Sequence, residues 1–428
     1  MDERKVVLHA AAAEGAAAPL APLGARRASP GALRWIVADA VEVEAVAVRM
    51  RREGAQLEWG EPVELPVREL VGLCRARGRS SVAAMRSDPS LLPDLQLGSW
   101  FDVHWRFRLL RRLAARAAPA VALAARIAPL VAFAADASFW AGVRSAATRR
   151  EWHRLTRSSF AALYYHRVAG EWKPGQDRID ISPERFARQL RLLRRLGFKA
   201  LSADEIVAFH TDPDALLPRR AYAITVDDGF RDAVEALAAR PEHRAQVFVC
   251  TESVGGSADW AGGEPVAGWD ELARLAATGA YIGSHGTSHA DLTRVEAVDD
   301  ALAESRSELE RRLGAPVPLL AYPHGRRDER VRRAAAAAGY RAAYTTDPGR
   351  NGAGTSPFDL RRVGPKEWDS SLSFLWKAVT GELVPARWER WLLLRARLRS
   401  RWRRSNAPQA AAEGAARSPE ATPPQEQP

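Results

Sequence analysis

The chain has 428 residues, of which 46% are hydrophobic, and a formal net charge of +11. This length allows two or three domains, and the apolar content is sufficient for a buried core. The chain has only two cysteines, Cys74 and Cys250, which excludes a disulfide framework.

The positive charge is concentrated in two short segments. Residues 105–116 contain five Arg and no acidic residue, and residues 385–404 contain eight Arg and one Glu. The rest of the chain is close to neutral, so the net charge does not indicate a nucleic-acid-binding face. We therefore expect no nucleic-acid partner.

Residues 1–30 form a low-complexity segment rich in Ala, Gly and Pro. Acidic residues follow Met1 closely and Glu14 interrupts the Ala-rich stretch, so the segment lacks the basic start and continuous apolar core of a secretory signal. We therefore expect a cytoplasmic location.

Residues 31–105 are predicted to form a small α/β region with a helix over residues 66–77. The stretch V-R-M-R-R-E-G-A-Q-L-E-W at residues 48–59 resembles the later half of a family 2 glycosyltransferase, an inverting enzyme with the A-type fold. In such enzymes a similar helix precedes a strand and an Arg/Gly-rich helix comparable to residues 73–85. No D-x-D metal motif occurs in residues 1–100, so the resemblance implies a glycosyltransferase-derived fragment and not a working transferase.

Residues 106–155 are predicted to form an Ala-rich helical connector, with the helical pattern over residues 109–147. Arg126 interrupts the apolar stretch 117–135. A charge near the middle of a membrane span costs roughly 2.5 to 3.5 kcal/mol on insertion scales. A spanning helix is therefore not favoured, and a connector or a hairpin lying on the membrane is expected.

Residues 156–384 alternate apolar runs with helical patterns. The runs predict strands over residues 161–168, 221–226, 246–250, 280–282, 317–322 and 342–345, with a seventh near 360–363. Helices are predicted over residues 183–196, 269–277 and 295–313. This alternation indicates an α/β fold with a mostly parallel sheet and helices outside it.

Polar residues follow two of these strands. Asp227 and Asp228 stand in T-V-D-D-G after the strand 221–226, and His285 and His289 stand in H-G-T-S-H after the strand 280–282. Adjacent carboxylates repel each other unless a cation or a shared proton offsets them. One Asp and two His suit a divalent metal in an open catalytic site with three protein ligands.

These motifs resemble those of the polysaccharide deacetylase (NodB-homology, carbohydrate esterase family 4) superfamily, which has T-F-D-D-G and H-[ST]-x-x-H. L-A-Y-P-H-G at residues 320–325 is similar to family loops such as F-A-Y-P-Y-G, and Y-Y-H-R-V at residues 164–168 is similar to an opening strand Y-H-x-[IV]. The resemblance covers about residues 160–370 in family order. It implies a distorted (β/α)7 barrel as the catalytic domain, preceded by a smaller helix-rich amino-terminal region.

The resemblance also implies roles for the residues of the motifs. Asp228, His285 and His289 would hold a divalent metal ion, with zinc as the expected ion. Asp227 would be the base that takes a proton from water.

A loop after the strand 317–322 would serve the oxyanion and the substrate. By the resemblance, Tyr322, Pro323 and Gly325 shape this loop, which offers a backbone N–H to the oxyanion. Backbone donors of this kind contribute about 2.7 to 4 kcal/mol to transition-state stabilisation.

Besides the changes at Val226 and Gly286, the chain departs from the family pattern at two points that concern the catalytic residues. Many relatives have an orienting Arg at the position of Ala321, and we expect Arg361 or Arg362 to replace it. Many relatives also end with an L-x-H motif that supplies the general acid, but no His follows His324 in this chain. His166 is the expected acid, with His324 as the alternative.

Residues 385–404 are predicted to form a basic amphipathic helix. Its large apolar residues recur at near-helical spacing among the arginines: Trp388, Trp391, Leu392, Leu398 and Trp402. This pattern indicates either a peripheral contact with the inner face of the membrane or a helix packed on its own domain. Residues 405–428 are predicted to be disordered, because they contain almost no large apolar residue.

Two functions from different classes remain. The first is a metal-dependent hydrolase that removes N-acetyl groups from an amino-sugar-containing saccharide, such as a lipid- or nucleotide-linked precursor. The second is a catalytically inactive carbohydrate-binding or scaffolding protein of envelope polysaccharide assembly. The intact Asp and His motifs favour the first function. The expected enzyme is an N-deacetylase that acts on a linear amide, and its expected partner is an N-acetylated saccharide.

Overall fold

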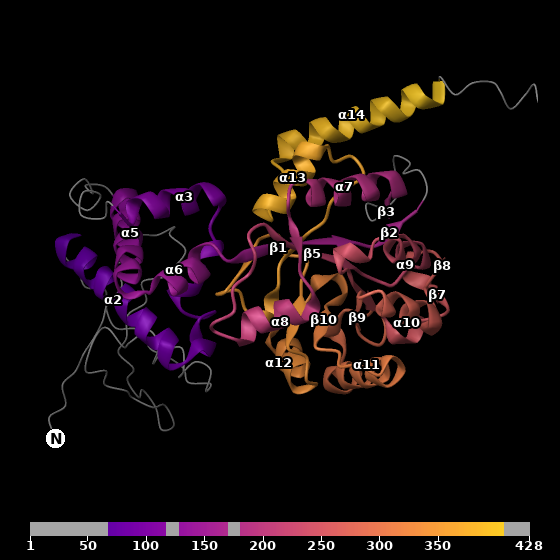
Figure 1. Ribbon diagram of the computed structural model, residues 1–428, viewed down its shortest axis with the longest axis horizontal. Coiled ribbons are helices and arrows are strands. Elements are labelled where there is room, and N and C mark those ends of the chain that lie inside the picture. The colour runs from indigo at the N-terminus through magenta and orange to yellow at the C-terminus, as the bar shows by residue number, and fades with distance from the viewer. Residues whose placement is uncertain (1–66, 117–127, 170–179, 406–428) are drawn as a thin grey trace, which may run out of the picture.

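The computed structural model describes residues 67–116, 128–169 and 180–405, which form a helical region followed by a sheet surrounded by helices (Figure 1). Several predictions for the sequence concern residues outside these ranges. They are the low-complexity segment 1–30, the glycosyltransferase-like stretch 48–59, most of the apolar stretch 117–135 and the tail after residue 405.

The described part of the amino-terminal region, residues 67–116 and 128–156, consists of helices. Their bounds are α2 (Val67–Ser87), η1 (Pro89–Leu91), η2 (Gln96–Phe101), α3 (Trp105–Ala114), α5 (Ala128–Ala146) and α6 (Arg149–Thr156). The helix predicted over residues 66–77 continues to Ser87, because no Pro occurs before Pro89 and the glycines on the way are tolerated. Gly78 lies against the backbone of α5 at Phe139, so the two long helices pack closely at this point.

The main sheet has nine strands in the order β11-β10-β9-β6-β5-β1-β12, with β13 paired to β1 and β4 paired to β5. All these pairings are parallel except that of β1 with β12. The bounds are β1 (Ser159–Tyr165), β4 (Lys199–Ala200), β5 (Ala221–Val226), β6 (Gln246–Val249), β9 (Tyr281–Ser284), β10 (Leu319–Ala321), β11 (Ala342–Tyr344), β12 (Asn351–Gly352) and β13 (Arg362–Val363).

Each of the seven predicted strands has a counterpart in this sheet. The first is shorter than predicted, because the chain leaves the sheet at His166 and forms β2 (Arg167–Val168), which pairs with β3 (Asp180–Ile181). An isolated parallel bridge between Tyr344 and Leu360 brings β11 towards β13, so the sheet curls. The fold is therefore mixed α/β with a curled sheet, and a regular (β/α)7 repeat stays a prediction.

Helices connect the parallel strands and cover the outside of the sheet (Figure 1). Their bounds are α7 (Pro183–Arg195), α8 (Ala203–Thr211), α9 (Arg231–Ala238), α10 (Trp269–Ala277), α11 (Val298–Leu313), α12 (Glu329–Ala337), α13 (Ser371–Thr380) and α14 (Ala386–Ser405). Short 3-10 turns and a small hairpin complete the domain: η3 (Pro241–His243), η4 (Thr251–Ser253), β7 (Ser257–Ala258), η5 (Asp259–Ala261), β8 (Glu264–Pro265), η6 (Leu292–Arg294), η7 (Pro323–Gly325) and η8 (Pro357–Asp359). Among the helices of the described ranges, none is both long and apolar enough to cross a membrane.

Alternation along the strands separates the two large clusters of the core. Phe160 and Ala162 of β1 belong to a cluster that continues into the helical region at Trp100 and Trp140, whereas Leu163 packs with the helices outside the sheet. The helical region thus contacts the sheet near the amino-terminal end of β1, where η2 lies against β12. The carboxyl ends of the strands lie at the opposite edge.

Candidate active site

The predicted site residues gather at the carboxyl edge of the sheet. Asp227 and Asp228 directly follow β5, His285 directly follows β9, and η7 follows β10. Because these strands are parallel members of one sheet, residues that follow their carboxyl ends meet at one edge. Sequence positions up to about 100 residues apart are thereby brought together.

Asp228, His285 and His289 form a compact cluster. One potential ligand atom from each lies within 4.8 Å of the others. The Oδ1 atom of Asp228 is 3.6 Å from the Nε2 atom of His285 and 3.5 Å from that of His289. Asp228 and His285 are buried, and His289 is half-buried.

This cluster fits a divalent cation. The Oδ1 atom of Asp228 is buried, and among the described residues none donates a hydrogen bond to it. Burial raises the pKa of Asp228 to about 8, and the neighbouring Asp227 carboxylate adds to this effect. The ionised carboxylate of Asp228 therefore needs a nearby positive charge. Tetrahedral ligands about 2.0 to 2.2 Å from a shared zinc ion are about 3.3 to 3.6 Å apart, close to the observed spacing.

The two histidines are held in the form that binds a metal. The Nδ1–H of His285 donates to the carbonyl oxygen of Ala321 at 2.7 Å, which leaves the Nε2 lone pair directed away from this bond. Burial lowers the pKa of His285. Burial and the neighbouring His285 and His324 lower the pKa of His289 to about 3. Both rings are therefore neutral at pH 7, as metal ligation requires.

The turn after β5 adopts an unusual backbone conformation. Asp228 has φ of 68°, in the left-handed region that non-glycine residues seldom occupy, and Gly229 has the same φ. A Cβ atom on Gly229 would also collide with the side chain of Val249. Strain of this kind is typical of functional sites, and here it lies at the predicted metal ligand.

Asp227 is held by a buried arginine. The guanidinium of Arg362 donates to both carboxylate oxygens of Asp227, at 2.7 and 2.8 Å, and also to the carbonyl of Thr345. The Arg362 guanidinium lies over the rings of Tyr164 and Tyr344. Burial alone would raise the pKa of Asp227, but Arg362 outweighs it and the pKa falls to about 2.

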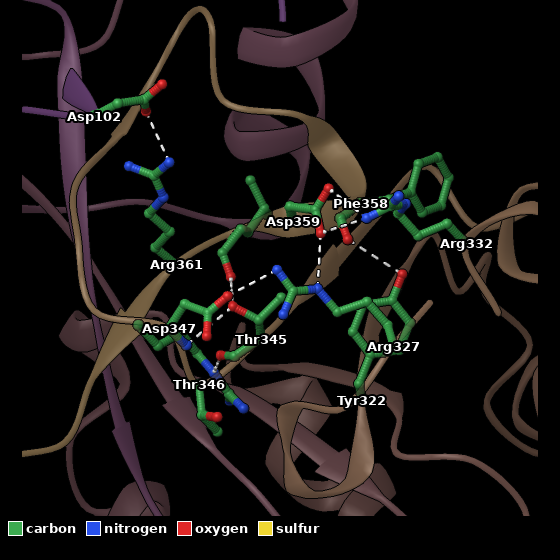
Figure 2. A network of polar contacts seen from close by, with 12 residues as sticks. Asp102, Tyr322, Arg327, Arg332, Thr345, Thr346, Asp347, Phe358, Asp359 and Arg361 are labelled. Carbon is green, nitrogen blue, oxygen red and sulfur yellow. Dashed lines mark hydrogen bonds and ion pairs between the residues drawn. The ribbon is translucent and has the colours of Figure 1, made fainter. Parts of the chain in front are cut away.

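Of the two arginines expected to replace the family Arg, Arg362 contacts Asp227 and Arg361 does not. Arg361 instead donates to Asp102 of the helical region at 2.7 Å (Figure 2). The two neighbours point to opposite sides because they precede and begin the short strand β13.

The loop after β10 is fixed by its own backbone. The amide of Tyr322 donates to the carbonyl of Tyr344 at 3.0 Å, and that of Gly325 donates to the carbonyl of Tyr322 at 2.8 Å. Pro323 has no N–H group, so the amide of His324 is the remaining candidate donor for an oxyanion. His324 has φ of 58°, again in the left-handed region.

The side chain of Tyr322 stabilises this loop and is not one of the candidate metal ligands. Its hydroxyl donates to the carbonyl of Phe358 at 3.2 Å (Figure 2). Nearby, Arg327 pairs with both Asp347 and Asp359, which ties the segments around η7, β11 and η8 together. This network had no recognisable signal in the sequence.

The two candidate acids occupy different surroundings. The ring of His324 is exposed and lies 4.4 Å from the ring of His289. His166 follows β1 and is half-buried, and its ring lies 5.7 Å from that of Tyr164. Burial lowers the pKa of His166 to about 4, so it is neutral at pH 7.

Trp260 is a site residue that the sequence analysis missed. It lies on η5, in the hairpin between β7 and β8, and its ring stacks on His289 with 4.7 Å between centroids and 13° between planes. Trp260 is 40% exposed, so a large apolar face lies beside the candidate metal ligands. No motif marks this position, because the contact joins a short loop to a distant strand end.

Comparison with known proteins gives one family for this part of the chain. The family model described as polysaccharide deacetylase matches residues 216–343. The chain is also similar to YxkH of Bacillus subtilis (strain 168), whose name places it among the polysaccharide deacetylases. The two are 22% identical over 206 residues, which cover 47% of this chain and 69% of that protein.

Two solved structures are each similar to about half of the chain. The deacetylase PplD of Streptococcus pyogenes, solved in complex with acetate, has 20% identity and a TM-score of 0.46, covering 51% of this chain and 98% of that chain. IcaB of Ammonifex degensii has 22% identity and a TM-score of 0.44, covering 52% of this chain and 97% of that chain.

Proposed function

Because the chain carries a polysaccharide deacetylase domain, we propose that it hydrolyses the N-acetyl amide of an amino sugar with a zinc ion held by Asp228, His285 and His289. The observation that carries this proposal is the combination of this cluster with the clamped carboxylate of Asp227 at one edge of the sheet. A lipid- or nucleotide-linked saccharide is the proposed substrate class.

Amide hydrolysis needs a nucleophile, a base and stabilisation of the developing oxyanion. When bound, a divalent cation lowers the pKa of water and polarises the amide carbonyl. Asp227 accepts the proton of the attacking water, and Arg362 keeps its carboxylate ionised and oriented for this transfer. The amide of His324 donates to the oxyanion as the carbonyl carbon becomes tetrahedral.

The departing amine must receive a proton. We assign this step to the side chain of His324, whose exposed ring lies beside His289, in preference to the sequence-based choice of His166. The lowered pKa of His166 supports this order, because an acid must hold a proton at the working pH.

The general acid can be tested by replacing one ring at a time. His324→Gln keeps the backbone amide and should lower kcat for acetate release by about 100-fold, whereas His166→Gln should lower it by much less. Metal content should stay unchanged in both variants. A larger loss of kcat in His166→Gln than in His324→Gln would instead identify His166 as the general acid.

The proposed function is tested by metal content and acetate release measured on the same purified protein. We expect stoichiometric zinc and acetate release from at least one N-acetylated saccharide in a panel. His285→Ala should lose both, and Asp227→Asn should keep the metal but lose about two to four orders of magnitude in rate. His153→Ala, in the helical region, is the matched control and should change neither.

Two outcomes would contradict the proposal. Full turnover and full metal content in His285→Ala would show that the metal site lies elsewhere. A folded wild-type protein that binds saccharides but releases no acetate, with zinc supplied, would favour the inactive carbohydrate-binding alternative. The cytoplasmic location expected from the sequence stays a prediction.

A further inference from the structure

Exposed large apolar side chains gather on one surface of the molecule. In the part of the chain that the structure describes, twelve such side chains are strongly exposed, and ten of them lie on α3, α13, α14 or the loop 381–385. The other two are Leu216 and Trp260. We refer to the three helices and this loop as the α3–α13–α14 surface.

Tryptophan contacts join the three helices into one surface. Trp105 of α3 meets Trp376 of α13 edge to face at 6.0 Å, and Trp376 meets Trp388 of α14 in the same way at 6.2 Å. The amide of Trp105 also donates to Glu382 at 3.2 Å. The three helices lie along the upper side of the molecule in Figure 1. Residues almost 300 positions apart in the sequence therefore form a continuous surface.

The helix α14 has two different apolar faces. Leu392 is buried and Trp388 packs against α13, so one face attaches the helix to the domain. Trp391, Leu394 and Leu398 follow one another at helical spacing on another face, and each is more than half exposed. The helix thus packs on its own domain, as one of the two expectations for residues 385–404 has it, and also presents an apolar stripe to solvent. The membrane contact stays a prediction.

The helix α3 extends the same apolar surface. Phe107, Leu110 and Leu113 recur at every third residue and are exposed. Next to this stripe, Arg111 forms an ion pair with Asp136 of α5 at 2.8 Å, which helps to hold the helix against α5. The exposed stripe is therefore a stable feature of the folded region. Leu372 adds a further exposed apolar side chain on α13.

Arginines border the apolar side chains. Arg106 on α3 is exposed, as are Arg387, Arg390 and Arg395 on α14. The guanidinium of Arg395 lies over the ring of Trp391 at 5.3 Å, so charge and aromatic surface are presented together. Positive charge beside a Trp and Leu stripe complements a surface that is apolar inside and anionic outside.

We propose that the α3–α13–α14 surface docks the protein peripherally on an anionic lipid bilayer. The Trp and Leu side chains enter the headgroup boundary, and the arginines contact anionic headgroups. This inference is independent of the proposed reaction, because it rests on other residues and is measured without a saccharide.

Vesicle sedimentation of the full chain tests this proposal. Vesicles of phosphatidylcholine with about one quarter phosphatidylglycerol should bind the wild type, and phosphatidylcholine alone should bind it much more weakly. Trp391→Glu/Leu394→Glu and Phe107→Glu/Leu110→Glu should each weaken binding by at least about tenfold. Leu216→Glu is the matched control, since this exposed leucine lies outside the surface, and its binding should equal that of the wild type.

A separate variant tests how much the arginines contribute to vesicle binding. Arg387→Gln/Arg395→Gln keeps the apolar stripe and should weaken binding by about fivefold per arginine at low ionic strength, with a smaller effect at high salt. Equal binding of the wild type and both apolar double variants would overturn the proposal. So would a wild-type dimer in solution that the double variants convert to monomer without any change in vesicle binding, because the surface would then join two copies of the chain. Unchanged thermal transitions confirm that the variants are folded.

Discussion

Two adjacent carboxylates at the end of β5 have opposite properties. The pKa of Asp227 is lowered to about 2 because Arg362 outweighs burial, and the pKa of Asp228 is raised to about 8 by burial and by Asp227 itself. Two neighbouring acids with separated pKa values mark different chemical roles. Asp227 is therefore ionised at pH 7, as the proposed proton acceptor must be, whereas Asp228 needs a neighbouring cation to stay ionised at that pH.

The role of the two hydrogen bonds from Arg362 to Asp227 can be tested with a substitution that keeps the positive charge. Arg362→Lys keeps the positive charge but cannot donate two parallel hydrogen bonds to the carboxylate. We expect kcat for acetate release to fall by about 10- to 100-fold while KM and metal content stay nearly constant. The neighbouring Arg361→Lys is the control, since Arg361 pairs with Asp102 outside the site. Equal activity of the two variants would argue against a positioning role of Arg362.

The stacking of Trp260 on His289 predicts a contribution to saccharide binding. An exposed aromatic face beside the reacting centre suits a sugar ring, whose C–H groups pack on aromatic surfaces. Trp260→Ala should raise KM by about five- to tenfold with a smaller change in kcat, and Trp260→Phe should restore part of the loss. Trp391→Ala, an exposed tryptophan on α14, should leave the kinetics with a soluble saccharide unchanged. A loss of metal in Trp260→Ala would instead indicate that the ring only supports His289.

Among the elements, α6 shows how one side chain links two helices. Glu151 accepts from the backbone N–H of Thr148 in a capping box at the start of α6 and pairs with Arg86 at the end of α2. The Arg86 hydrogen bond lowers the pKa of Glu151 to about 2 from its ordinary value of 4.5. The ionised carboxylate therefore stabilises the folded state.

The sign of the pH dependence follows from this lowered pKa. The stabilisation by Glu151 is present above the pKa of the unfolded chain and is lost as the pH falls from about 5 towards 2. Because Arg86 is half-exposed, we expect Glu151→Gln to cost only about 0.5 to 1 kcal/mol in free energy of unfolding at pH 7. The difference from the wild type should shrink in acid when urea unfolding is measured at several pH values. Glu235→Gln, on the exposed face of α9, should show a small difference at every pH.

For the whole molecule, the helical region and the sheet share one apolar core. Trp100 and Trp140 of the helical region belong to the same cluster as Phe160 and Leu319 of the strands. The backbone of Gly354, after β12, lies directly against that of Gly98 in η2. The two parts are therefore expected to unfold together.

The contact between Gly354 and Gly98 predicts a long-range effect on stability. Gly354→Ala places a methyl group against the backbone of Gly98, so helix and strand must separate, and the free energy of unfolding should fall by about 1 to 3 kcal/mol. Gly72→Ala in α2 is the control, because a Cβ atom there meets nothing within 4 Å and should stabilise the helix by about 0.5 to 1 kcal/mol. A single unfolding transition should persist in both variants. Two separate transitions would show that the helical region and the sheet are independent.

The sequence alone determined the features that depend on neighbours along the chain. Strands and helices were predicted from local periodicity, and the motifs at residues 225–229 and 285–289 contain the three residues that the structure brings together as a candidate metal site, Asp228, His285 and His289. This was possible because the ends of parallel strands in one sheet must meet at one edge. The sequence also showed that Ala321 stands where many relatives have an orienting Arg. It limited the expected replacement to two neighbouring residues, Arg361 and Arg362.

The tertiary structure decided what depends on residues far apart in the chain. It selected Arg362 over Arg361 and placed Trp260 on His289, although no motif marks either contact. It also joined α3, α13 and α14 through their tryptophans. Local patterns cannot specify such contacts, because the curl of the sheet and the packing of the helices set which distant side chains meet. Periodicity shows that a side chain is apolar or charged, whereas only packing decides which of its neighbours it touches.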